Sequence, residues 1–300
     1  MSKSAKTWRI LAAHSNSGVA VPDEPDSREG LREVPFRRRT GRPLPGDRVA
    51  LDAAGAVHRI LTRRNVFGRG VRGGRFREMA ANLDQLLIVV APRPAPSANL
   101  IHRYLAAAAI LDIAPLLVLN KIDLPHESLD SELERFTRLG HAALQVCAET
   151  GHGLEELRAR LGHGISLAAG QSGVGKTSLA NRLVPDLQSQ TAALSRVTGK
   201  GTHTTTTCQL HRLPDGGWLA DSPGVWEYSL WNMPPETLRR GFPEFGGLTG
   251  QCRFRNCLHV DEPGCRVLEA VNQGQIPGFR HRAWRQLLSE TGGRPSRPSR

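Results

Sequence analysis

Residues 170–177 have the types and the spacing of a loop that binds phosphate groups. They read GQSGVGKT, which matches the pattern G-x-x-x-x-G-K-[ST], and they lie between an apolar segment and a segment with helical character. In such a loop the backbone N–H groups and the N-terminus of the following helix face the phosphates. We expect Lys176 to neutralise the β- and γ-phosphates of a nucleotide and the hydroxyl of Thr177 to bind Mg²⁺. The residues predicted to hold the nucleotide here are Gly170, Gln171, Ser172, Gly173, Val174, Gly175, Lys176, Thr177 and Ser178.

A second motif, N-K-x-D, is formed by Asn120, Lys121 and Asp123 at the end of an apolar segment that resembles a strand. An aspartate carboxylate accepts hydrogen bonds from both N1–H and the amino group of guanine, whereas adenine offers no such pair of donors. The motif is weak alone, but together with the phosphate loop it predicts a site for a guanine nucleotide. The sequence CAETG from residue 147 ends another predicted strand, and we expect the Ala148 N–H to support the same base.

A third motif, DSPG at residues 221–224, follows a predicted hairpin. We expect Asp221 to hold Mg²⁺ through water and the Gly224 N–H to meet the γ-phosphate. The preceding loop, GKGTHTTTTCQL, contains four consecutive threonines, one of which would complete the magnesium shell and order the loop as a switch. We favour Thr204 or Thr205 for this role, because the next two threonines more simply begin a strand.

The residue after DSPG is Val225, at a position where a Ras-like protein carries a glutamine that orients the attacking water. A valine side chain neither donates nor accepts a hydrogen bond, so we expect unassisted hydrolysis to be slow. His203 is the local candidate for the missing group, and a partner that repositions the loop is the other. His203 could equally be a surface or capping histidine.

Three cysteines and one histidine follow within 14 residues: Cys252, Cys257, His259 and Cys265. Their spacing, C-x₄-C-x-H-x₅-C, predicts a tetrahedral Zn²⁺ site, and four protein ligands leave no open position for catalysis. We therefore expect a structural zinc site, with Arg253, Arg255 and Arg266 forming a basic surface around it. The remaining cysteines, at positions 147 and 208, lie on predicted strands and are interpreted as core residues.

The net charge of +12 is distributed unevenly along the 300 residues. Residues 36–77 contain 12 arginines and two acidic residues, and residues 252–300 contain nine arginines and four acidic residues. Residues 78–251, in contrast, contain 14 basic and 17 acidic residues. Two basic ends around a slightly acidic centre favour a nucleic acid partner. Only five of the 40 basic residues are lysines, and two of these are Lys121 and Lys176.

The predicted fold is α/β with three domains and a tail. In residues 1–79, two strands around a tight turn (DRVALD and AVHRILTR) suggest an OB-type β-barrel that binds RNA, with FGRGVRGGRFRE from residue 67 as a Gly/Arg loop. Residues 80–230 alternate strands and helices, as in a parallel nucleotide-binding sheet. We expect residues 231–290 to form a helical zinc-binding domain and residues 291–300 a disordered basic tail.

The order of the motifs is unusual, because the base motif at Asn120 precedes the phosphate loop at Gly170. A parallel sheet tolerates such a circular permutation, since its site is built from the ends of strands wherever the chain is cut. The permutation brings the strand of Asp221 directly before the zinc-binding segment. We therefore expect sensing of the γ-phosphate to be coupled to a basic, zinc-braced domain.

Taken together, these motifs resemble the circularly permuted P-loop GTPases of the RsgA (YjeQ) family, which assist late assembly of the small ribosomal subunit. The resemblance runs from Leu44 to Cys265 and rests on LPGDRVAL, ANLDQLLIV, NKIDL, GQSGVGKTSL, HTTT, DSPG and the cysteine spacing. It implies GTP/GDP, Mg²⁺ and one structural Zn²⁺, GTP hydrolysis stimulated by the subunit, and binding to its rRNA. Its departures include His102, where the family usually has aspartate, and the first 35 residues.

Two other functions stay open at this stage. An RNA-binding protein in which the nucleotide is only structural or regulatory is compatible with Val225, and an ATPase that remodels RNA would require that Asp123 does not select the base. No apolar run approaches the roughly 18 residues of a membrane helix, and the N-terminus lacks a secretory apolar core. We expect a cytoplasmic monomer without a membrane partner.

Overall fold

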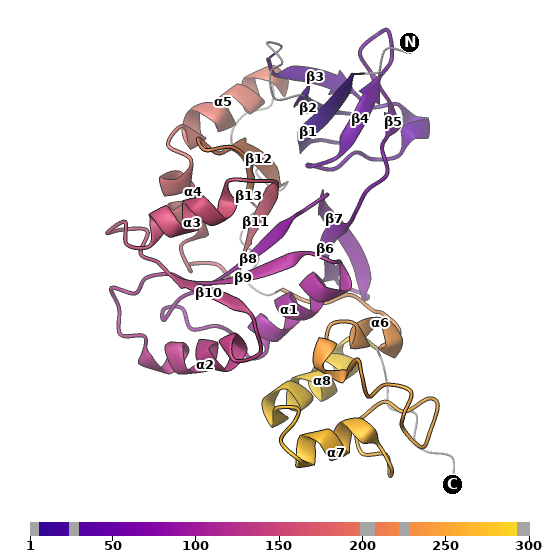
Figure 1. Ribbon diagram of the computed structural model, residues 1–300. Coiled ribbons are helices and arrows are strands. Elements are labelled where there is room, and N and C mark those ends of the chain that lie inside the picture. Colours follow the sequence, from indigo (N-terminus) through magenta and orange to yellow (C-terminus); the bar gives the residue numbers. More distant parts are fainter. Residues whose placement is uncertain (1–5, 24–29, 199–207, 222–227, 293–300) are drawn as a thin grey trace, which may run out of the picture. The chain divides into compact units, whose positions relative to one another are not determined.

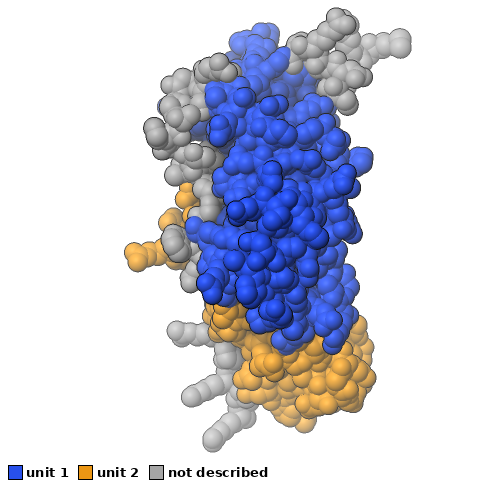
Figure 2. All heavy atoms as spheres, turned by 90° about the vertical axis from the view of Figure 1, so that its left-hand side faces the viewer, with its two compact units in different colours: residues 1–68, 78–96, 114–226 blue, residues 69–77, 97–113, 227–300 orange. Residues whose placement is uncertain are grey.

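The computed structural model describes residues 6–23, 30–198, 208–221 and 228–292 (Figure 1). The chain divides into two compact units, coloured separately in Figure 2. Unit 1 comprises Met1–Gly68, Glu78–Pro96 and Ala114–Trp226, and unit 2 comprises Arg69–Arg77, Ser97–Ile113 and Glu227–Arg300. The sequence-based domain boundaries at residues 79, 230 and 290 stay a prediction.

Five N-terminal strands of unit 1 form the predicted OB-type barrel (Figure 1). They are β1 (Thr7–Ala13), β2 (Ser17–Pro22), β3 (Arg32–Pro35), β4 (Arg48–Leu51) and β5 (Val57–Ile60), with the short helix η1 (Arg38–Thr40) between β3 and β4. Antiparallel pairing gives the order β3–β2–β1–β4–β5, and a bridge between Phe36 and Val57 closes the ring. Inward-facing apolar residues on alternate positions, such as Ile10, Val34 and Val49, fill its core.

The second half of unit 1 is a parallel sheet with the order β10–β9–β8–β11–β13. Its strands are β8 (Gln85–Val90), β9 (Ala114–Leu119), β10 (Ala142–Gln145), β11 (Ile165–Ala169) and β13 (Trp218–Asp221). The antiparallel strand β12 (Gln209–Arg212) follows β13 in the sheet and pairs with β1 through Gln209 and Ala12. The helices of this region are α2 (Glu127–Thr137), α3 (Leu154–Leu161), α4 (Lys176–Leu183) and α5 (Leu187–Thr198).

Near-continuous apolar strands explain why this sheet is parallel and buried. Strand β8 has buried residues from Leu86 to Val90, and alternate ones, Leu87 and Val89, pack in one cluster with leucines of α3 and α4. The parallel registers bring the carboxyl ends of the strands to one edge, where ligands of open α/β sheets bind.

The prediction of a Gly/Arg loop from residue 67 was wrong. This segment forms a two-stranded sheet from β6 (Val66–Val71) and β7 (Arg75–Ala81). Within unit 2, the Gly70 N–H donates to the Ser229 carbonyl at 2.8 Å, and the Asn232 N–H donates to the Gly74 carbonyl at 2.9 Å. A Cβ at Gly70 would lie 2.2 Å from the Leu230 carbonyl oxygen, so this glycine lets a distant chain segment approach the strand.

Unit 2 also contains α1 (Leu100–Ile110), α6 (Pro235–Arg239), η2 (Pro243–Phe245), α7 (Arg266–Asn272) and α8 (Gly278–Glu290). Arg103 of α1 forms two 2.9 Å hydrogen bonds with the Glu290 carboxylate of α8. The buried Arg280 guanidinium pairs with Glu244 and donates to Nδ1 of His102 at 2.8 Å. His102 therefore supplies an acceptor to this cation, as an aspartate at that position would.

Candidate functional site

The base motif lies directly after β9, and its asparagine joins three segments of unit 1. Asn120 is 1% exposed, and its Nδ2 donates to the Val174 carbonyl of the phosphate loop at 2.9 Å. Its Oδ1 accepts the Ala148 N–H at 3.1 Å. The structure therefore brings the base motif, the phosphate loop and the CAETG segment together, although 54 residues separate Asn120 from Val174. The expected contact of the Ala148 N–H with guanine stays a prediction.

Lys121 reinforces the same junction from a left-handed backbone conformation, with φ of 64°. Its Nζ donates to the carbonyls of Gly173 at 2.7 Å and Arg93 at 2.9 Å. The phosphate loop binds the same neighbouring segment, because Gln171 Nε2 donates to the Ala95 carbonyl at 2.7 Å. Residues 93–95, which follow β8, thus receive hydrogen bonds from both nucleotide motifs.

The phosphate loop runs from the end of β11 to the start of α4, the context that its pattern requires. Lys176 is buried, and its Nζ donates to the carbonyls of Gly170 and Gln171 at 2.8 Å each. Burial lowers the pKa of Lys176, while the nearby Asp221 carboxylate opposes this shift. Gly175 has φ of 94°, and a Cβ there would lie 2.3 Å from Asn120 Nδ2. The loop therefore needs glycine at this position to admit the base motif.

The residues predicted to bind Mg²⁺ lie at the same edge of the sheet. Asp221 ends β13 opposite Ala168 of β11, one residue before the end of the strand that leads into the phosphate loop. Burial raises the pKa of Asp221, and Lys176 opposes this shift. Thr177 and Ser178 are exposed in the first turn of α4. A carboxylate and a hydroxyl at this edge are oxygen ligands of the kind that Mg²⁺ prefers, so the described residues fit the ion.

Four predicted residues fall outside the described parts of the chain: His203, Thr204, Thr205 and Gly224. Their roles at the γ-phosphate stay predictions. Val225 and the two following threonines, Thr206 and Thr207, lie outside as well.

Two side chains that the sequence did not assign to the site form hydrogen bonds with the residues predicted to recognise the base. Cys147, interpreted as a core residue, is buried two residues after β10, but its Sγ also donates to Asp123 Oδ1 at 3.0 Å. Arg182 of α4 donates to the carbonyls of Ala148 and Glu149 at 2.7 Å each. The only feature of the sequence that could have assigned Cys147 to the site is its position beside Ala148 in the CAETG segment. No feature of the sequence points to Arg182.

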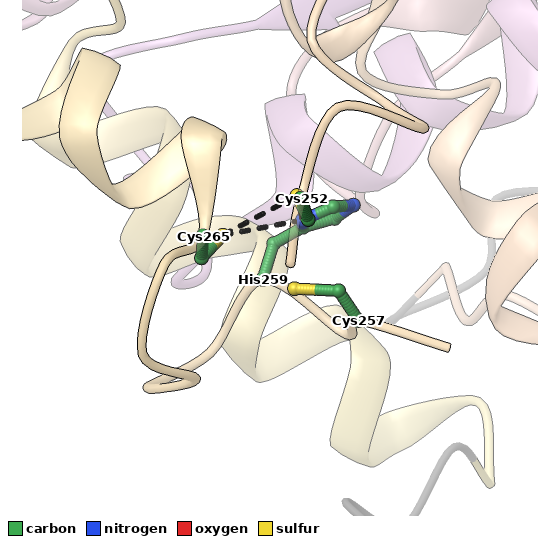
Figure 3. A group of neighbouring side chains, drawn as sticks. All are labelled: Cys252, Cys257, His259 and Cys265. Carbon is green, nitrogen blue, oxygen red and sulfur yellow. Dashed lines mark hydrogen bonds between the residues drawn. The ribbon is translucent and has the colours of Figure 1, made fainter. Parts of the chain in front are cut away.

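The cysteine cluster lies in unit 2, where Cys252, Cys257, His259 and Cys265 converge as predicted (Figure 3). All four ligand atoms lie within 4.8 Å of one another. His259 Nδ1 lies 3.4 Å from Cys265 Sγ and 3.6 Å from Cys252 Sγ, and the two sulfurs are 4.0 Å apart. A tetrahedral zinc with Zn–S bonds of about 2.3 Å separates its sulfur ligands by about 3.8 Å, so the cluster fits the ion.

The surroundings of the cluster support metal binding. Burial lowers the pKa of His259 to about 4, so its imidazole is in the neutral form that binds metals. Burial also raises the pKa of the Cys257 and Cys265 thiols, so binding of zinc here would release protons. His281 Nε2 donates to the His259 carbonyl at 2.7 Å, and Trp284 Nε1 donates to the Leu258 carbonyl at 2.8 Å. Helix α8 thus supports the backbone of the cluster.

One anionic side chain organises the loop between two of these ligands. Glu262 accepts the backbone N–H groups of Leu258 at 2.7 Å and Val260 at 2.8 Å. Burial acts to raise the pKa of Glu262, but the backbone N–H groups outweigh it and lower the pKa. Glu262 is therefore a fixed carboxylate that holds the loop.

The parallel sheet, the phosphate loop after β11 and the base motif after the earlier strand β9 define a circularly permuted P-loop GTPase fold with an N-terminal barrel and a C-terminal Cys₃His cluster. A family model described as RsgA GTPase matches residues 60–231, more than half of the chain. The chain therefore belongs to the RsgA GTPase family.

Known proteins agree with this assignment. The chain is 46% identical over 254 residues to the small ribosomal subunit biogenesis GTPase RsgA of Azotobacter vinelandii, covering 82% of this chain and 74% of the relative. A crystal structure of YjeQ from Thermotoga maritima matches with a TM-score of 0.74 and 31% identity, covering 96% of this chain and 99% of that one. YloQ, described as a circularly permuted GTPase, has the same fold at a TM-score of 0.74 and 23% identity, with 97% and 96% coverage.

Proposed function

We propose that this protein is a GTPase that binds the small ribosomal subunit and its rRNA and assists or checks a late step of subunit maturation. GTP hydrolysis, stimulated by the subunit, would drive release of the protein from the subunit. The relatives are small ribosomal subunit biogenesis GTPases, which supports the proposed partner, and membership of the RsgA GTPase family supports GTP hydrolysis. The observation that carries the proposal is the hydrogen bond from Asn120 Nδ2 to the Val174 carbonyl, because it joins the base motif to the phosphate loop in one site.

Each motif has a defined task in this proposal. Asp123 accepts from the guanine N1–H and amino groups, and so excludes ATP. Lys176 and the N–H groups of the loop neutralise the β- and γ-phosphates, and Thr177 and Asp221 hold Mg²⁺. When bound, Mg²⁺ neutralises charge that develops on the phosphate oxygens.

The proposed intrinsic rate is low, because Val225 cannot orient the attacking water. His203 or a group of the ribosome supplies this function, and Thr204 or Thr205 and the Gly224 N–H sense the γ-phosphate. The subunit accelerates hydrolysis by ordering this loop, and the loss of phosphate then weakens binding to the subunit.

The proposed partner is polyanionic, and the basic segments at residues 36–77 and 252–300 are suited to rRNA. The five cysteines, all within the described residues, form no disulfide, and three of them belong to the Cys₃His cluster. None of the described helices combines the length and the apolar character needed to cross a bilayer. We place the protein in the cytoplasm as a monomer.

Single-turnover GTP hydrolysis, measured with and without purified small subunits, tests the proposal. We expect slow hydrolysis alone and a strong acceleration by the subunit. If the subunit binds the protein but leaves the rate unchanged, the nucleotide is regulatory and the protein is an RNA-binding protein instead. Competition of labelled GTP by excess ATP checks the base: efficient displacement by ATP would contradict the role of Asp123.

A further inference from the structure

The loop between Cys252 and Cys257 presents an aromatic side chain to solvent. Phe254 is 42% exposed, and the only other large apolar side chain that stays exposed in the described parts of the chain is Leu31, at 37%. Burying an aromatic ring is strongly favourable, so this exposed ring can gain that free energy by packing against a partner. The described residues of unit 2 leave this ring at the surface.

The backbone around Phe254 is held in a defined shape. The Arg253 N–H donates to the Gly264 carbonyl at 3.1 Å, and the Cys257 N–H donates to the Phe254 carbonyl at 3.3 Å. Both ends of the loop are cysteines of the Cys₃His cluster. Phe254 is therefore displayed from a preorganised turn, and ordering it on a ligand costs little conformational entropy.

Arg253 and Arg255 flank Phe254 in the sequence, and their charges are available. Arg253 Cζ lies 5.6 Å from the centroid of the Phe254 ring. Arg253 and Arg255 are exposed and form no ion pair with the described residues. In contrast, the nearby Arg266 is paired with Glu269. The tip of the loop thus combines one aromatic face with two uncompensated cations.

We propose that Phe254 is a stacking platform for an unpaired RNA base, with Arg253 and Arg255 binding the adjacent phosphates. The inference deepens the proposed function, on which its biological setting rests, by naming the form of RNA that this loop recognises. A single exposed ring cannot reach a base inside a duplex, whereas an unstacked base offers its whole face. A protein partner is disfavoured, because two unpaired cations beside the ring suit a polyanion better than an apolar surface.

A direct test uses a single-stranded oligouridylate of twelve nucleotides with one central 2-aminopurine, whose fluorescence falls when it stacks on an aromatic ring. We expect quenching by the full-length protein. Phe254→Leu, which keeps an apolar side chain without a π-face, should abolish quenching and weaken binding about tenfold. Phe254→Trp should restore both. Leu31→Ala, at the other exposed apolar residue, is the matched control and should behave as the unmodified protein.

The salt dependence tests the arginines separately. Each of Arg253→Gln and Arg255→Gln should reduce the slope of log K against log salt by about 0.7. Equal binding of a duplex of the same length, or unchanged quenching in Phe254→Leu, would overturn the proposal. Zinc content and thermal melting should be unaffected in all variants, because the substituted side chains are exposed.

Small subunits separate this inference from the proposed function. If the unmodified protein shows subunit-stimulated GTP hydrolysis but Phe254→Leu binds the oligonucleotide normally, only the stacking proposal fails. If Phe254→Leu loses affinity for the subunit while oligonucleotide binding is intact, the loop contacts a ribosomal protein and the stacking proposal is again wrong. If quenching depends on Phe254 but the subunit does not accelerate GTP hydrolysis, the stacking proposal is supported and the proposed function is wrong.

Discussion

The thiol of Cys147 lies 3.0 Å from Oδ1 of Asp123, the carboxylate predicted to select guanine. The same sulfur accepts the Thr150 N–H at 3.5 Å, so it connects the base motif to the CAETG turn. A carboxylate that must accept two hydrogen bonds from a base gains from a donor that fixes its orientation. Cys147 is thus a candidate positioning residue for Asp123.

Replacing Cys147 with alanine should weaken GTP binding about three- to tenfold, because a thiol is a modest hydrogen-bond donor. Cys147→Ser, which keeps a donor of similar size, should bind GTP close to normally. Competition of fluorescent GTP by ATP measures the selectivity, which should decrease only in the alanine variant. Equal losses in both variants, with a lowered melting temperature, would mean that Cys147 only fills the core.

Lys176→Ala should abolish measurable GTP binding, because no other described ammonium group reaches the carbonyls of the phosphate loop at Gly170 and Gln171.

Asp123→Asn should weaken GTP binding by about 10- to 100-fold, since the amide cannot accept both guanine donors. Circular dichroism and thermal melting serve as the fold controls and should change little in Asp123→Asn. Normal GTP affinity in either variant would place the nucleotide elsewhere.

Cys257→Ser should reduce the zinc content below one ion per chain and loosen unit 2, while GTP affinity changes less than about twofold. Trp284 reports this change, because it is buried and its indole N–H binds the Leu258 carbonyl beside the cluster. Zinc analysis measures the loss of metal, and tryptophan fluorescence and limited proteolysis measure the loosening of unit 2. Cys208→Ala, at a buried cysteine outside the cluster, should retain the metal. A collapse of GTP affinity in Cys257→Ser would contradict separate nucleotide and zinc sites.

His211 on β12 should make the protein acid-sensitive. It is 2% exposed, its Nδ1 has no hydrogen-bond partner among the described residues, and burial lowers its pKa from 6.5 to about 4. The unfolded chain takes up a proton near pH 6.5 while the folded chain does not, so stability falls as the pH decreases from about 6.5 toward 4. Between pH 7.5 and pH 5 this loss should be about 2 kcal/mol.

His211→Leu removes the titrating group and keeps an apolar side chain of similar size. Urea unfolding at both pH values should show that this variant loses about 2 kcal/mol less than the unmodified protein. His58→Gln, at an exposed position, is the control and should not change the difference. An identical pH dependence of His211→Leu and the unmodified protein would contradict the prediction.

The sequence predicted the parts of this protein whose signals are local. Apolar runs at residues 85–90, 114–119 and 165–169 correspond to β8, β9 and β11, and the phosphate loop follows its strand as the pattern requires. The convergence of the four predicted zinc ligands could be expected from their spacing, since 14 residues leave few ways to arrange them. The barrel was predicted from β4 and β5, although the strands β1 to β3 give weaker patterns.

Features that depend on distant residues could not be predicted in this way. The glycines of the β6–β7 hairpin predict a flexible loop. In the structure the segment around Leu230 instead packs so closely against Gly70 and Gly74 that a side chain at either position would clash. The contacts of Cys147 and Arg182 likewise require knowledge of which strand ends meet. Helix α5 (Leu187–Thr198) was not predicted either, because its apolar pattern is modest.

The close approach of Gly175 to Asn120 has an evolutionary consequence. Any side chain at position 175 would place a carbon 2.3 Å from the amide nitrogen of Asn120, 55 residues earlier in the chain. Neither position can drift alone without breaking the junction, so their substitutions should show strong epistasis. A shuffled gene that joins the front half of one such protein to the back half of another would be viable only when both parents share this pair.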